Sequence, residues 1–97
     1  MKHILKALNQ SNTVVYVELP DAAAAKRFQA EAAAAGFTFG DGVSPAAREM
    51  ARVMVVHADG TICYPGVVGM TAFGSGAKTI GGKKLVRAVF SEREEDG

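Results

Sequence analysis

The sequence predicts an α+β fold in which a small, mostly antiparallel sheet of about four strands packs on one alanine-rich helix, in the order β-α-β-β-β. Three features carry this prediction. β-Branched and aromatic residues dominate 13–19, nine alanines fill 21–35, and an Asp-Gly pair separates two further β-rich runs. A chain of 97 residues has the size of one domain, so residues 1–97 are expected to share a single core.

The amino-terminal part of the chain should contribute a short helix and then a strand. Residues 2–8 place apolar side chains at helical spacing between lysines, which favours a short helical turn, with a strand as the alternative. Residues 13–19 form the clearest strand. Side chains alternate along a strand, which gives each face its own set. One face carries Val15, Val17 and Leu19, and the other carries Val14, Tyr16 and Glu18.

The alanine-rich segment 21–35 is expected to be the main helix. Pro20 suits the start of a helix, and the Asp21 carboxylate complements the positive end of the helix dipole. Gly36 supplies the residue that ends it. The small alanines allow close approach to a sheet, and Phe28 is the expected anchor.

A brief strand and a short helical turn should follow. Residues 37–39 alternate like a strand and lead into a glycine turn. Ser44 and Pro45 form a typical helix start, so one or two helical turns, or an ordered loop, are expected to about Met50.

Two β-rich runs, 52–58 and 61–64, predict a hairpin. The intervening Asp-Gly pair favours a two-residue turn in which both residues adopt positive φ. This turn would pair Ala58 with Thr61 and so fix the register of the two strands. One face would then carry Val55, His57, Ile62 and Tyr64, and the other Met54, Val56 and Cys63.

The last third of the chain is rich in glycine. Residues 66–82 are expected to form a long irregular loop, which in a small domain is functional or mobile. A final strand is predicted at 85–90, and an acidic tail that frays is predicted at 91–97. A single helix covers only one face of the sheet, so the other face needs this loop, the amino-terminal turn or another molecule. The loop residues suited to this cover are Met70, Ala72 and Phe73.

No catalytic or metal-binding arrangement is recognisable, so the chain is not expected to be an enzyme or to hold a cofactor or metal. The predicted register places His57 and Cys63 on opposite faces, whereas a catalytic pair needs hydrogen-bonding distance. Residues 74–79 resemble a phosphate-binding loop only in part, because alanine precedes Lys78 and glycines follow.

The composition indicates the cellular compartment of the protein and limits its possible partners. The lone Cys63 cannot form an internal disulfide and favours a reducing compartment. The sequence shows no secretory signal and no apolar stretch of bilayer length, so neither export nor a membrane partner is expected. The net charge of +1 gives no general attraction to nucleic acid. We therefore expect a cytoplasmic protein.

A basic cluster lies within the glycine-rich segment 74–87. Its four cations are not interrupted by an acidic residue, so they could follow a phosphate backbone or meet an acidic protein surface. No aromatic residues for base stacking lie between them. The cluster consists of Lys78, Lys83, Lys84 and Arg87.

Three segments resemble short accessory proteins carried by prophages and mobile elements of gut bacteria. They are Glu18-Leu19-Pro20-Asp21, the run from Phe28 to Gly42, and His57-Ala58-Asp59-Gly60-Thr61-Ile62, and the resemblance extends over about residues 13–75. Small proteins of this kind often act by binding host machinery, including as anti-CRISPR or other anti-defence inhibitors. The resemblance therefore implies a protein-binding role and assigns no residue a function.

Three hypotheses follow. The first is a non-enzymatic protein-binding factor, such as an inhibitor of a CRISPR-type defence complex, with a protein or nucleoprotein partner or a homodimer formed through a sheet face. The second is a nucleic-acid-binding module that uses segment 74–87. The third is a ligand-binding domain or enzyme with its pocket under loop 66–82. The candidate partner-binding residues are Lys78, Lys83, Lys84, Arg87, Tyr64, Ile62, Val55 and His57.

Overall fold

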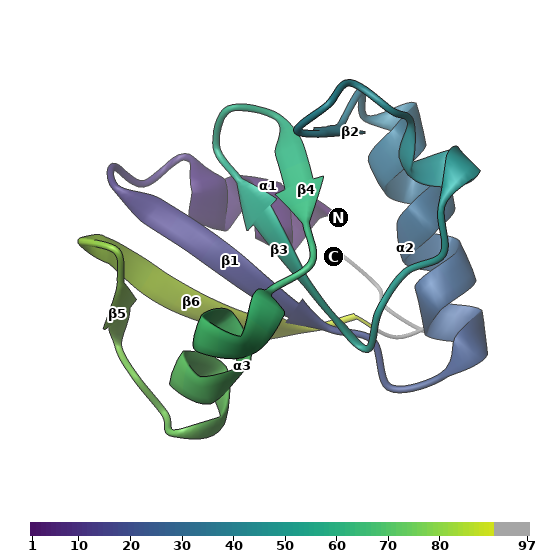
Figure 1. The fold of residues 1–97 in the computed structure, drawn as a ribbon. Helices are drawn as coiled ribbons and strands as arrows, with labels where there is room; N and C mark the ends of the chain where they lie inside the picture. Colours follow the sequence, from purple (N-terminus) through teal and green to yellow (C-terminus); the bar gives the residue numbers. More distant parts are fainter. Residues whose placement is uncertain (91–97) are drawn as a thin grey trace.

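The computed structural model describes residues 1–90 and has an α+β architecture, with three α-helices and a six-stranded sheet in that range (Figure 1). The helices are α1 (Lys2–Leu8), α2 (Ala22–Ala34) and α3 (Gly66–Gly74), with a 3-10 turn η1 (Pro45–Ala47). The strands are β1 (Thr13–Glu18), β2 (Thr38–Phe39), β3 (Val53–His57), β4 (Thr61–Cys63), β5 (Thr79–Ile80) and β6 (Lys83–Val89). The acidic tail predicted at 91–97 lies outside the described residues.

The sheet is mixed, in the order β2-β4-β3-β1-β6-β5. β1 pairs antiparallel with β3 but parallel with β6, and the short β2 pairs parallel with β4. The prediction of a mostly antiparallel sheet of about four strands was therefore wrong in its detail. The α+β class and the two strands of the β3–β4 hairpin were predicted correctly.

Helices α1 and α2 cover one face of the sheet. Ile4 of α1 and Phe28 of α2 are fully buried against β1 and β3, and Phe28 meets Phe90 edge to face with ring centroids 5.6 Å apart. Residues 2–8 are thus a helix and not a strand. The main helix also forms as predicted, because the Asp21 side chain accepts a hydrogen bond from the Ala24 amide at 2.8 Å. The β1 residues on this face are Val15 and Val17.

Helix α3 covers the opposite face (Figure 1). Phe73 stacks on Tyr16, with ring centroids 6.0 Å apart, and Val14 and Val55 complete the buried floor. The prediction of an irregular loop over 66–82 was wrong, since this segment contains α3 and β5. The expectation that it covers the second face is confirmed for Ala72 and Phe73, whereas the Met70 side chain is 43% exposed.

The close approach of α3 to the sheet requires a glycine. A Cβ atom built on Gly69 would lie 2.8 Å from the Tyr16 hydroxyl and 3.1 Å from Pro65 Cβ. Both distances are shorter than ordinary contacts, so a side chain here would push the helix away from β1. Gly74, at the other end of α3, has no atom within 4 Å of the same position.

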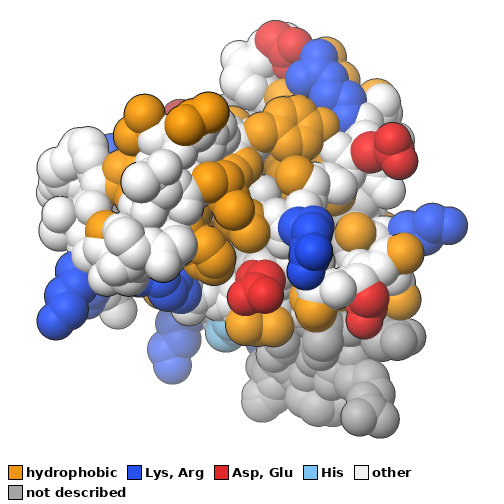
Figure 2. All heavy atoms as spheres, turned by 60° about the horizontal axis from the view of Figure 1, so that its bottom comes forward, with side chains coloured by type: hydrophobic (Ala, Val, Ile, Leu, Met, Phe, Trp, Pro, Cys, Tyr) orange, Lys and Arg blue, Asp and Glu red, His pale blue; other side chains and the backbone are white. Residues whose placement is uncertain are grey.

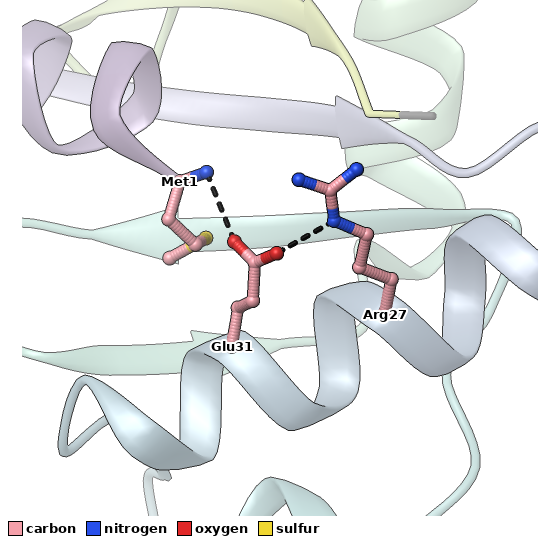
Figure 3. Close-up of polar contacts among 3 residues, drawn as sticks. All are labelled: Met1, Arg27 and Glu31. Atoms are coloured by element: carbon pink, nitrogen blue, oxygen red, sulfur yellow. Dashed lines mark hydrogen bonds and ion pairs between the residues drawn. The ribbon is translucent and has the colours of Figure 1, made fainter. Parts of the chain in front are cut away.

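A three-residue polar contact joins α1 to α2 (Figure 3). The Met1 amino group donates to the Glu31 carboxylate at 3.2 Å, and Arg27 Nε donates to the other oxygen at 2.7 Å. Burial raises the pKa of Glu31, but the hydrogen bonds from Arg27 and the amino group outweigh it and hold the pKa below its ordinary value. The carboxylate form of Glu31 therefore stabilises the fold.

We predict that Glu31→Gln lowers the free energy of unfolding by about 0.5–1 kcal/mol at neutral pH, since the pair is partly exposed. A lowered folded-state pKa contributes stability that is present above the unfolded-state pKa and is lost as pH falls through the folded-state value. The difference between Glu31→Gln and wild type should therefore be constant near neutrality and shrink in acid. Urea titrations between pH 3 and 7 test this, with the exposed Glu49→Gln as control; a pH-independent difference would contradict it.

We also predict that Gly69→Ala lowers the free energy of unfolding by about 1–3 kcal/mol through overpacking. Gly74→Ala should leave stability unchanged or raise it by up to about 1 kcal/mol, because alanine is the better helix former. Adding Tyr16→Phe to Gly69→Ala should restore part of the loss, since it removes the shorter of the two contacts. Urea denaturation of the four proteins measures these differences; equal effects at both glycines would disprove the close approach.

Candidate binding surfaces of helix α3

Helix α3 has no charged side chain, and its ends are held from outside. Pro65 precedes its first turn, and Arg87 of β6 donates to the carbonyl oxygens of Ala72 and Phe73 at 3.4 and 3.2 Å. A cation at this end of a helix also complements the dipole. The guanidinium lies 5.5 Å from the centre of the Phe73 ring. Arg87, predicted to belong to a basic contact surface, thus secures the carboxyl-terminal end of α3.

The outward side of α3 is an exposed apolar surface. Val67 and Val68 are 85% and 76% exposed, and they are the most exposed of the large hydrophobic residues described. Together with Met70 they form what we call the α3 ridge. Figure 2 turns the lower part of Figure 1 toward the viewer and shows hydrophobic side chains gathered on this face, with Lys and Arg side chains at its margin. Exposed apolar groups that lie together in this way are typical of contact surfaces.

The inward side of α3 borders a small cleft. The cleft has a volume of about 270 Å³ and opens between the start of α3 and the turn that joins β5 to β6. Its floor is the sheet, where Val14, Tyr16 and Val55 are almost completely buried. Its lining residues are Val14, Tyr16, Val55, His57, Cys63, Pro65, Ile80, Gly81 and Lys83.

His57 and Cys63 meet in this cleft, which corrects the predicted register. Strand β4 pairs so that Cys63 lies opposite Val55 and Ile62 lies opposite Val56, and the same register places Thr61 opposite His57. The turn has three residues and not two, because Gly60 takes positive φ at 91° and Asp59 does not. His57 and Cys63 therefore share a face, with Nε2 and Sγ 3.4 Å apart.

Three titratable side chains of the cleft, those of Cys63, His57 and Tyr16, have pKa values shifted toward their neutral forms. Burial raises the pKa of the Cys63 thiol, and the Asp59 carboxylate raises it further. Burial lowers the pKa of His57 and raises that of the Tyr16 phenol. A reactive cysteine needs the opposite shift, toward thiolate. The short His57–Cys63 distance thus comes without activation of the thiol.

The predicted basic cluster does not form one surface. Leu85 packs on the α3 side of the sheet, so alternation directs Lys83 to that side and Lys84 to the other. Lys83 borders the cleft, and Lys78 is exposed near β5. Arg87 binds the end of α3. The four cations predicted to meet a phosphate backbone or an acidic protein surface are therefore divided between two faces and a structural contact.

The apolar candidates from the hairpin have different positions. Val55 and Ile62 are buried on opposite faces of the sheet, so neither side chain is available to a partner in this structure. His57 is half-buried in the cleft. Tyr64 is 46% exposed, and its hydroxyl donates to the Glu49 carbonyl at 2.7 Å.

The sequence reasoning missed the α3 ridge. The segment Gly66–Gly74 contains three glycines, which favoured a loop, yet six of its nine residues are Val, Met, Thr, Ala or Phe. Pro65 before the segment was the one local signal for the start of a short apolar helix.

We predict that Cys63 is alkylated by iodoacetamide more slowly than glutathione at pH 7.5, because burial raises its pKa and limits access. Asp59→Asn should speed this reaction, since it removes a negative charge while its amide oxygen can still accept from the Thr61 amide. Mass spectrometry of the single cysteine gives the rates, and Glu49→Gln is the control. A rate equal to that of glutathione, or no effect of Asp59→Asn, would contradict the neutral cleft.

Comparisons with known proteins give no relative from which a function could be inferred, so the functional argument rests on the fold and on these surfaces. The chain matches no protein-family model, no curated protein and no solved structure. Within residues 1–90, no helix combines the length and the apolar character needed to cross a bilayer.

Proposed function

We propose that the protein is a non-enzymatic binding factor that recognises another protein through the α3 ridge. The observation that carries this proposal is the exposure of Val67 and Val68, at 85% and 76%, on a helix that packs firmly against the sheet by its other side. Burying both valines against a partner would contribute about 3–5 kcal/mol. The rigid attachment of α3 through Phe73 and Arg87 limits the conformational entropy lost on binding.

The charges around the ridge favour an acidic partner over a second copy of the chain. Residues 60–90 contain four cations and no Asp or Glu. Two copies that met through their ridges would bring these cations together, which opposes self-association. The partner surface is therefore apolar at its centre and acidic at its border, with Lys78 and Lys83 as exposed cations that the same part of the chain offers to it.

The neutral His57–Cys63 pair supports a binding role rather than nucleophilic chemistry. The lone thiol favours a reducing compartment, so we place the protein in the bacterial cytoplasm. The resemblance to accessory proteins of mobile elements directs the search for the partner to host machinery, including defence complexes.

The deciding experiment compares the wild-type protein with Val67→Ser/Val68→Ser. Serine and valine have similar helix propensities, so this variant should keep α3 while losing the apolar surface. A partner captured from nuclease-treated bacterial lysate is identified, purified and titrated against both proteins. We expect affinity to fall at least tenfold in the double variant, and Lys78→Glu to weaken binding and reduce its dependence on salt.

Leu5→Ser is the matched control, because Leu5 is an exposed leucine of α1 at 39% and lies outside the ridge. It should leave the affinity unchanged. A captured protein that binds Val67→Ser/Val68→Ser as tightly as wild type would refute the proposal. Dimerisation of the chain through the ridge in sedimentation, or a partner that binds only with nucleic acid present, would refute it as well.

A further inference from the structure

The cleft beside α3 is lined by a tyrosine whose hydroxyl has no hydrogen-bond partner among the described residues. Tyr16 is only 4% exposed, and its hydroxyl forms no hydrogen bond with any residue among 1–90. The hydroxyl lies against Gly69 and close to Pro65, which is itself a wall of the cleft. The hydroxyl keeps some exposure to solvent, so its proton can be donated to water or to a bound ligand.

The surroundings of this hydroxyl define what could satisfy it. The floor and one wall are apolar and consist of Val14, Val55 and Ile80. Burial raises the pKa of Tyr16, which keeps the phenol protonated and able to donate a hydrogen bond at neutral pH. The volume of about 270 Å³ is close to the lower end of the range for small-molecule sites.

We propose that this cleft binds a small apolar molecule carrying one hydrogen-bond acceptor, of the size and character of an aromatic ketone. The carbonyl accepts a hydrogen bond from the Tyr16 hydroxyl, and the ring lies on Val14, Val55 and Ile80. The neutral His57–Cys63 pair forms part of the wall and takes no part in covalent chemistry. This site is separate from the α3 ridge, because Val67 and Val68 do not line the cleft.

The test uses two probes of nearly equal shape, acetophenone and ethylbenzene, which differ in the carbonyl oxygen. Binding to the full chain is followed by NMR of valine and isoleucine methyl groups. We expect saturable shifts at Val14, Val55 and Ile80, and a threefold to tenfold tighter binding of acetophenone, the range expected for one hydrogen bond (~0.7–1.4 kcal/mol). Tyr16→Phe keeps the ring on Phe73 and should abolish this preference.

Tyr64→Phe is the control, since it removes an exposed phenol outside the cleft and should leave the preference intact. Equal preference in wild type and Tyr16→Phe would overturn the proposal. Shifts that do not saturate, or that centre on Val67 and Val68, would overturn it too.

A second readout needs no variant and depends only on the folded wild-type protein. Cys63 lines the cleft, so saturating acetophenone should slow its alkylation severalfold, whereas an unchanged rate would refute occupation of the cleft. The same measurement on Val67→Ser/Val68→Ser should give the same protection. If acetophenone fails to protect Cys63 while the partner still binds, the cleft proposal fails and the proposed function stands. If the partner does not bind through the ridge while Cys63 is still protected, the proposed function fails and the cleft proposal stands.

Discussion

Both faces of β1 must be kept from water, and the other elements are arranged to achieve this. Five of its six residues are buried, with Val15 and Val17 on one side and Val14 and Tyr16 on the other. A strand that is apolar on both faces needs a layer on each side and neighbours at both edges. Helices α1 and α2 supply the first layer, α3 supplies the second, and β3 and β6 take the edges. The place of each element in the fold follows from this central strand.

The same helix that completes the second layer creates both candidate surfaces. Gly69 and Phe73 bring α3 down onto Tyr16, so its opposite side is left exposed by residues 1–90. The short helix also leaves part of the sheet uncovered beside its first turn, and the cleft forms there. The packing of α3 on Tyr16 therefore creates both the exposed ridge and the cleft that we propose as a ligand site. They differ in chemistry because the ridge is exposed and the cleft is bordered by buried polar groups.

Sequence reasoning succeeded where a local rule decides the structure. The two faces of β1, the start of α2 at Asp21 and the buried position of Phe28 all follow from periodicity and capping. It failed at the hairpin, because Asp-Gly occurs in two-residue and in three-residue turns, and here Asp59 does not take the positive φ that the two-residue turn requires. That one-residue difference moved Cys63 to the face of His57, which local propensity could not foresee. Helix α3 was missed because its stability comes from contacts with distant residues, such as Arg87.

The parallel pairing of β1 with β6 has a consequence for how the protein is made. Residues 13–18 pair with β3 along one edge and with residues 84–89 along the other, so the centre of the sheet joins segments that lie far apart in the sequence. On the ribosome, β1 therefore emerges before β6 is synthesised, and one of its two edges lacks a partner until residues 84–89 have left the exit tunnel. Contacts of this long range also slow folding, because a large loop must close before they form. Until then, β3 can pair with the other edge of β1 and limit its exposure.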